Sequence, residues 1–127
     1  RKWAQAMRDD DNFAVDHKKL QERIYCLNDA QLMVGDGRSY GAGYIRWSGS
    51  RHPQAADLCN ACADSMEASV SAVNRIFVMT GIDLAVITES LKDKQIRLAV
   101  ADLIDEADRH EQEAVHALEL LLPVLPG

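Results

Sequence analysis

The chain has 127 residues, of which 47% are hydrophobic and 6% aromatic, and its net charge is −6. This size and apolar content predict a single domain over residues 1–127 with a buried core, and they exclude disorder. The negative charge argues against binding to nucleic acid or to anionic membranes. No apolar run is long enough to span a bilayer. Three cysteines do not form a disulfide framework, so we expect a reducing, cytoplasmic location.

The first predicted helix occupies residues 1–34. From Phe13 to Val34 the core-facing residues recur at alternating intervals of four and three, which is typical of one face of a bundle helix. Asp11 or Asn12 is the expected N-cap of this helix. The residues before this acidic cluster are expected to form a separate short turn of helix.

Residues 35–50 are rich in glycine and lack a helical pattern, so we predict a long loop between the first and second long helices. The loop carries Tyr40, Tyr44, Arg46 and Trp47, and arginine with aromatic residues is a composition enriched at protein interfaces. We therefore predict that this loop contacts a partner. Trp47 is expected to be buried against the end of the bundle, whereas Arg46 is expected to point outward.

The second long helix is predicted over residues 51–80, with Pro53 in its first turn and Gly81 ending it. It contains Cys59 and Cys62 three positions apart, on the apolar face. A zinc site needs a second pair of ligands at matched spacing, and a redox pair is typical of a βαβ context, which this sequence lacks. Both cysteines are therefore predicted to be core residues.

The last predicted segment is residues 82–122, a short helix over about 82–89 followed by a long helix over about 91–122. Ser90 and Asp93 have the spacing of a capping box, which favours a break between the two helices. One continuous helix is the alternative, because neither glycine nor proline separates them.

The end of the chain is apolar beyond the last helix. Leu122, Val124 and Leu125 follow a helix that already ends in leucines, and an apolar end of this kind is normally covered. We predict that these residues and the aromatic loop form an interface, and that the chain associates with itself.

Histidine and glutamate residues offer an alternative function, a metal-binding or ligand-binding bundle. His17 and His110 lie on the core faces of the first and last long helices, and would share a layer if those helices were antiparallel. Glu106 and Glu113 flank His110. The sequence Glu113-x-x-His116 resembles one half of the di-iron site of ferritin-like bundles, a family that needs a second copy of this motif. The chain has no second copy, so we predict no cofactor and keep a metal ion as the alternative.

A third reading is a small helical nuclease. Arg109 and His116 resemble the Arg-x(4–6)-His pattern of HEPN-type helical ribonucleases, which implies that Arg109 binds phosphate and that His116 is a general acid or base. Residues 101–122 carry seven carboxylates and one arginine, and this charge would repel RNA.

Taken together, these features predict an all-α chain, a four-helix bundle with three long helices and one short helix. The leading functional prediction is a non-catalytic interaction or regulatory module that acts in a homo-oligomer or larger assembly. A small ligand remains the alternative partner.

Overall fold

The computed structural model describes residues 2–125, and within that range the chain is all-helical, with 87% helix and no strand. The predicted all-α class is therefore confirmed. The elements, in chain order, are α1 (Lys2–Arg8), a 3-10 turn η1 (Asp10–Asn12), α2 (His17–Arg51), a second 3-10 turn η2 (Pro53–Ala55), α3 (Ala56–Thr80), α4 (Leu84–Ser90) and α5 (Lys94–Leu121).

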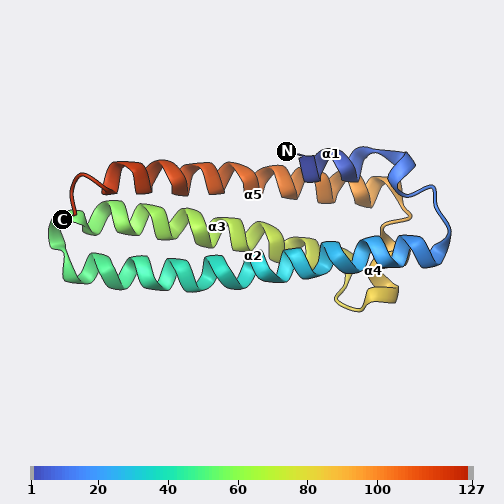
Figure 1. The fold of residues 1–127 in the computed structure, drawn as a ribbon, viewed down its shortest axis with the longest axis horizontal. Helices are drawn as coiled ribbons and strands as arrows, with labels where there is room; N and C mark the ends of the chain where they lie inside the picture. Colours follow the sequence, from blue (N-terminus) through green and yellow to red (C-terminus); the bar gives the residue numbers. More distant parts are fainter. Residues whose placement is uncertain (1, 126–127) are drawn as a thin grey trace.

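The three long helices lie lengthwise against one another, with α3 packed against both α2 and α5. Figure 1 shows that α2 and α5 run in the same direction and that α3 runs opposite to both. The short helix α1 packs along the N-terminal part of α5, and α4 packs against α2. Three long helices are present as predicted, but their bounds differ from the prediction. The predicted four-helix bundle is not confirmed, because residues 2–125 contain five helices, with residues 2–8 forming a second short one.

The predicted glycine-rich loop over residues 35–50 is wrong, because these residues are the C-terminal half of α2. The buried positions Gln31, Ala42 and Gly49 continue the stripe of the first half of α2 at helical spacing. Each glycine costs a helix about 1 kcal/mol relative to alanine. Packing of a continuous stripe against α3 outweighs that cost, since tertiary contacts supply most helix stability in proteins.

Gly49 is required where α2 approaches α3. A Cβ atom at this position would lie 2.8 Å from Cβ of Cys59, closer than side chains pack. Three residues later His52 caps the helix, and its backbone N–H donates to the carbonyl of Ser48 at 3.1 Å. Pro53 then opens η2, so α3 itself begins at Ala56, a few residues after the predicted start at residue 51.

The start of α2 also differs from the prediction. Asp11 and Asn12 belong to η1, and the N-cap is Asp16, whose side chain accepts a hydrogen bond from the Lys19 backbone N–H at 3.1 Å. The Asp16 carboxylate satisfies a free backbone N–H and favours the positive end of the helix.

The break between α4 and α5 is confirmed, but the capping box is not formed. Asp93 is itself the N-cap of α5 and accepts from the Gln95 backbone N–H at 2.8 Å. Ser90 ends α4, and its hydroxyl donates to the carbonyl of Thr80 at 3.1 Å. Gly81 ends α3 as predicted, with a φ of 91°, which favours glycine.

A charged clamp fixes the N-terminal segment to the start of α5. The Asp10 carboxylate accepts a hydrogen bond from Lys94 at 2.7 Å and another from Arg97. Both interactions lower the pKa of Asp10, the Lys94 hydrogen bond most strongly. The Arg97 side chain is buried and lies over the ring of Phe13, 4.5 Å from its centre. Residues of η1 and the connection to α2 therefore close over the α4–α5 turn.

Candidate interaction surface

An exposed aromatic stripe lies on the C-terminal half of α2. Tyr40, Tyr44 and Trp47 are spaced by four and three residues, so they lie on one face of the helix. Their exposed fractions are 81%, 65% and 55%. This face is turned away from α3, because the opposite face of α2 carries the buried stripe.

The aromatic side chains form a continuous surface. The ring centres of Tyr44 and Trp47 lie 5.9 Å apart, and the guanidinium of Arg51 lies 5.6 Å from the centre of the Trp47 ring. Trp47 was expected to be buried against the end of the bundle, and this expectation is wrong. Trp47 lies within the continuous helix α2, so there is no loop that could fold back over the end of the bundle.

Arg46 does not point outward as predicted. Its guanidinium donates to Asp64 at 2.6 Å and to Glu67 at 2.7 Å, and both carboxylates belong to α3. These hydrogen bonds raise the pKa of Arg46 above its ordinary value, and the hydrogen bond to Glu67 does so most strongly. Arg46 thus holds α2 to α3, and Arg51 is the basic residue that lies beside the aromatic stripe.

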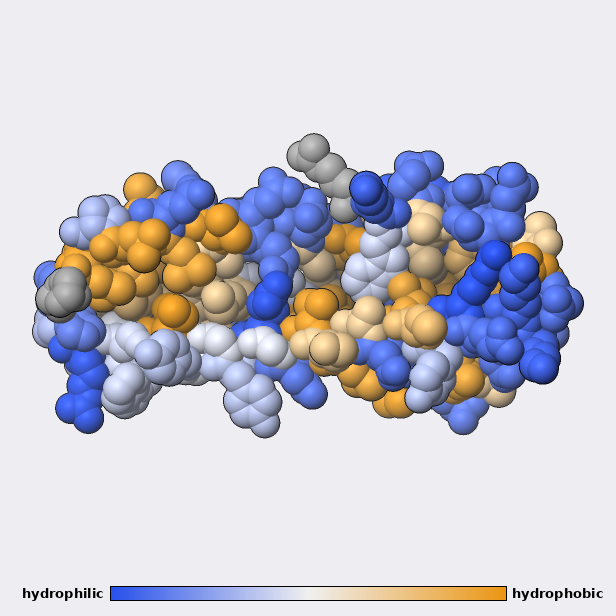
Figure 2. Space-filling model, in the orientation of Figure 1, coloured by the Kyte–Doolittle hydropathy of each residue, from blue (hydrophilic) through white to orange (hydrophobic). Residues whose placement is uncertain are grey.

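The stripe meets the apolar end of α5. A cavity of about 330 Å³ lies between the C-terminal ends of α2 and α5, and its lining includes Tyr44, Leu122 and Leu125. Leu122 is 72% exposed and Val124 is 37% exposed. Figure 2 shows apolar residues gathered at this end of the molecule. The structure therefore brings together two predicted interface segments that are about eighty residues apart in the sequence. We call this combined area the docking surface: Tyr40, Tyr44, Trp47, Leu122, Val124 and Leu125.

The predicted metal-binding layer is not formed. His17 and His110 were expected to meet if their helices were antiparallel, but α2 and α5 run parallel. His17 therefore lies at the end of the molecule where both helices begin, 3.9 Å from Glu89 of α4. His110 lies more than halfway along α5.

The remaining members of that predicted cluster follow α5. Nδ1 of His110 lies 2.9 Å from a carboxylate oxygen of Glu113, and its Nε2 lies 3.9 Å from Glu106. Glu106 is bound in turn by Arg75 of α3. His116 points away from them into solvent. Across residues 2–125, no three His, Cys, Asp or Glu side chains are grouped so that they could hold a metal ion.

The predicted nuclease pair is exposed on α5. Arg109 and His116 are seven residues apart, which separates them by about 10 Å along the helix axis. Nδ1 of His116 lies 3.8 Å from Glu119. Both residues therefore lie on an acidic, convex helix surface.

Cys59 and Cys62 are fully buried, as predicted for core residues. The Cys62 thiol lies 3.6 Å from the backbone carbonyl of Ala114 on α5. Burial raises the pKa of Cys62, and the neighbouring Cys59 raises it further. Cys26, by contrast, is exposed on the first half of α2.

A polar triad in the middle of the bundle escaped the sequence reasoning. Nε of Arg38 donates to Glu111 at 2.6 Å, and the fully buried Ser69 hydroxyl donates to the same carboxylate at 3.0 Å. The three residues come from three different long helices. The spacing of four and three residues could have indicated Arg38, because it continues from Val34 to Arg38 if the glycine-rich segment is helical.

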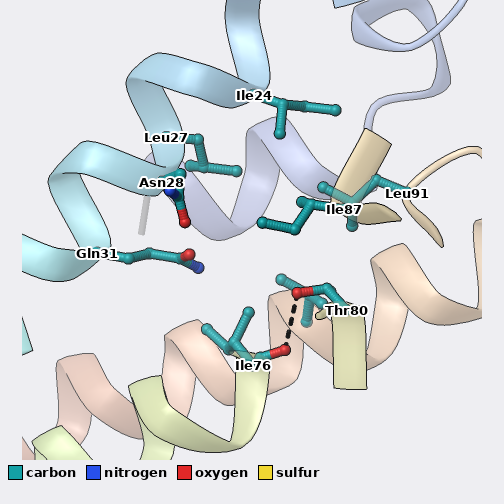
Figure 3. A pocket seen from close by; sticks show the side chains of 9 residues that line it. Ile24, Leu27, Asn28, Gln31, Ile76, Thr80, Ile87 and Leu91 are labelled. Atoms are coloured by element: carbon teal, nitrogen blue, oxygen red, sulfur yellow. Dashed lines mark hydrogen bonds between the residues drawn. The ribbon is translucent and has the colours of Figure 1, made fainter. Parts of the chain in front are cut away.

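A small hollow lies where α2, α3 and α4 meet. Figure 3 shows Asn28 and Gln31 pointing from α2 into it, opposite Thr80 of α3. The volume of the hollow is about 10 Å³, which matches a single water molecule. It is therefore too small for an organic ligand.

No known protein family, curated protein or solved structure matches this chain. Among the described residues, no single helix has both the length and the apolar character of a membrane span, although the bent pair Pro53–Thr80 and Leu84–Ser90 together meets that test by length and composition.

Proposed function

We propose that this chain is a non-catalytic helical interaction module that associates with itself through the docking surface. The observation that carries the proposal is the row of three exposed aromatic side chains on one face of α2. Tyrosine and tryptophan are the residue types that contribute most binding energy at protein interfaces. An aromatic row of this kind on a water-exposed helix is costly to leave uncovered.

The size of the surface explains why both of its parts are needed. Aromatic side chains of roughly 200 Å² each, exposed to the observed degree, offer roughly 400 Å² in total. A stable interface buries about 800 Å² on each partner. The row on α2 is therefore too small alone, and the adjoining residues Leu122, Val124 and Leu125 supply further apolar area.

The shape of α2 also suits close approach of a partner. Gly37 and Gly43 flank the aromatic side chains, and the space that a Cβ would occupy at either glycine is open. Tyr40 and Tyr44 therefore stand above a low helix surface, into which side chains of a partner can fit. A second copy related by a two-fold axis places the same ridges and hollows against each other.

The test is the molar mass by light scattering of the wild type and two variants at micromolar concentration. The wild type is expected to be a dimer or larger, and the double variant Tyr44→Ala with Trp47→Ala is expected to be a monomer with an unchanged circular dichroism spectrum. Tyr25→Ala is the matched control, because Tyr25 is 55% exposed on the other half of α2. A monomeric wild type, or equal loss of mass in the control, would contradict the proposal.

A further inference from the structure

A second site lies in the middle of the molecule, away from the docking surface. Helices α1, α2, α3 and α5 line a cavity of about 180 Å³ that is partly open to solvent. An apolar cavity of about 150 Å³ is enough for one benzene-sized molecule. Its walls are largely apolar, and they include Val34, Val73 and Ile104. The cavity therefore has room for a small organic molecule with an apolar body.

One end of the cavity is polar and rigid. Arg38, Ser69 and Glu111 line it, and the hydrogen bonds of the triad fix Glu111 between α2 and α3. Arg38 uses only Nε for this pair, and within residues 2–125 its two terminal nitrogens have no hydrogen-bond partner. Those nitrogens are donors whose planar fork matches a carboxylate.

The side of the cavity that α1 forms is aromatic. Trp3 of α1 lines the cavity, and its indole Nε1 is buried away from solvent, without a hydrogen-bond partner in the part of the chain that the structure describes. A ligand in the cavity therefore meets the Trp3 ring and not its N–H, and the ring adds to the apolar surface that a ligand can contact.

The cavity also offers a free negative charge. Asp108 lines it and accepts one hydrogen bond, from Gln112 at 2.8 Å to Oδ2, which leaves Oδ1 without a partner among the described residues. The Glu111 charge is balanced by Arg38, whereas Asp108 has no basic partner within that range. A ligand that carries only a carboxylate would be repelled by Asp108, and one that carries only an amine would leave the terminal nitrogens of Arg38 without an acceptor.

We propose that this cavity binds a free amino acid with an apolar side chain. Its carboxylate accepts hydrogen bonds from the terminal nitrogens of Arg38, its ammonium pairs with Asp108, and its side chain lies among the apolar walls. Both charges of the zwitterion are then matched, which neither a simple acid nor a simple amine achieves. This inference is independent of self-association, because none of these residues belongs to the docking surface.

Binding is tested by calorimetry with L-valine, L-leucine and L-phenylalanine at millimolar concentration. We expect at least one of them to bind saturably and to raise the midpoint of thermal unfolding with concentration. The analogues of that amino acid that lack the amine or the carboxylate, 4-methylpentanoate and 3-methylbutylamine in the case of leucine, are expected to bind at least tenfold more weakly. Failure of all three amino acids to bind, or equal binding of either analogue, would overturn the proposal.

Two variants place the ligand in this cavity. Asp108→Asn is expected to weaken binding at least tenfold, whereas Glu119→Gln, which removes the same charge from an exposed position on α5, is expected to leave it unchanged. Ala107→Leu fills the cavity from α5 and is expected to abolish binding. Circular dichroism of each variant shows whether the fold is kept. If Ala107→Leu does not fold, the affinity of Asp108→Asn alone decides whether the ligand lies in this cavity. Unaltered affinity in Asp108→Asn, or equal weakening by Glu119→Gln, would contradict the assignment.

Discussion

At the scale of single residues, neighbouring side chains on α2 have opposite roles. Arg46 contacts α3 through Asp64 and Glu67, whereas Trp47, the next residue, projects into solvent. A helix turns by about 100° at each residue, so adjacent positions face different surroundings. The predicted loop had instead placed Trp47 against the bundle and Arg46 in solvent.

This difference gives a prediction for Arg46→Ala. The substitution is expected to lower the midpoint of thermal unfolding by a small amount, since exposed ion pairs contribute little. The dimer mass is expected to stay unchanged under conditions where Trp47→Ala reduces it. Light scattering gives the molar mass of both variants, and thermal unfolding gives their stability. If Arg46→Ala were monomeric and as stable as the wild type, Arg46 would belong to the interface.

The cysteines give a second prediction. Cys26 is expected to react quickly with a thiol reagent in the native protein, while Cys59 and Cys62 react only when the protein unfolds. Burial raises the pKa of Cys62, so the reactive thiolate is scarce as well as inaccessible. Mass spectrometry after timed labelling counts the modified thiols, and rapid modification of all three would show that the α3 core is open.

At the scale of helices, α2 is a long helix that contains five glycines. Gly49 lies where α2 and α3 almost touch, whereas the space beside Gly37 and Gly43 is open. The glycines of this helix therefore differ in their surroundings: Gly49 is closely packed, whereas Gly37 and Gly43 leave an open outer surface.

Alanine substitutions distinguish the two causes. Gly37→Ala is expected to stabilise the folded chain by about 1 kcal/mol, because alanine loses less backbone entropy in a helix and meets no neighbour here. Gly49→Ala is expected to destabilise it by about 1–3 kcal/mol, because the new methyl group overlaps Cys59. Chemical denaturation measures both changes in the background of the monomeric Tyr44→Ala, Trp47→Ala double variant, where no second copy covers Gly37. Destabilisation by Gly37→Ala would argue against a helix at that position.

At the scale of the whole molecule, the ends of the bundle are closed by different means. The end where α5 begins is held by the clamp of Asp10, Lys94 and Arg97, and the opposite end carries the docking surface. Because the clamp lowers the pKa of Asp10, its contribution to stability is present at neutral pH and is lost as the pH falls below the ordinary aspartate range of about 4.

The clamp can be tested by acid unfolding. Asp10→Asn is expected to be less stable than the wild type at pH 7. The difference is expected to shrink as the pH falls below about 4 and through the lowered pKa at which the folded wild-type carboxylate is protonated. Thermal unfolding across this pH range measures the effect. A stability difference that stays constant with pH would show that the Asp10 charge is not what holds the segment.

Much of this fold could be predicted from the sequence, but the relative direction of the helices could not. The stripe over residues 17–34 located part of α2, and the glycine at position 81 located the end of α3. They contain no information on whether α2 and α5 run parallel, and the predicted pairing of His17 with His110 depended on that direction. Composition marked residues 40–47 as the surface that we propose as an interface. The element that carries them was predicted as a loop, because glycine propensity was given more weight than the continuing stripe.

The account depends most on residues 35–51 being a rigid helix that a second copy covers. Amide hydrogen exchange, followed by mass spectrometry at a dilute and a concentrated protein solution, tests this directly. We expect slow exchange over this segment at both concentrations, and still slower exchange at high concentration over its second half and over residues 121–125. Fast exchange at unstructured rates over residues 35–50, or protection that does not change with concentration, would contradict the account.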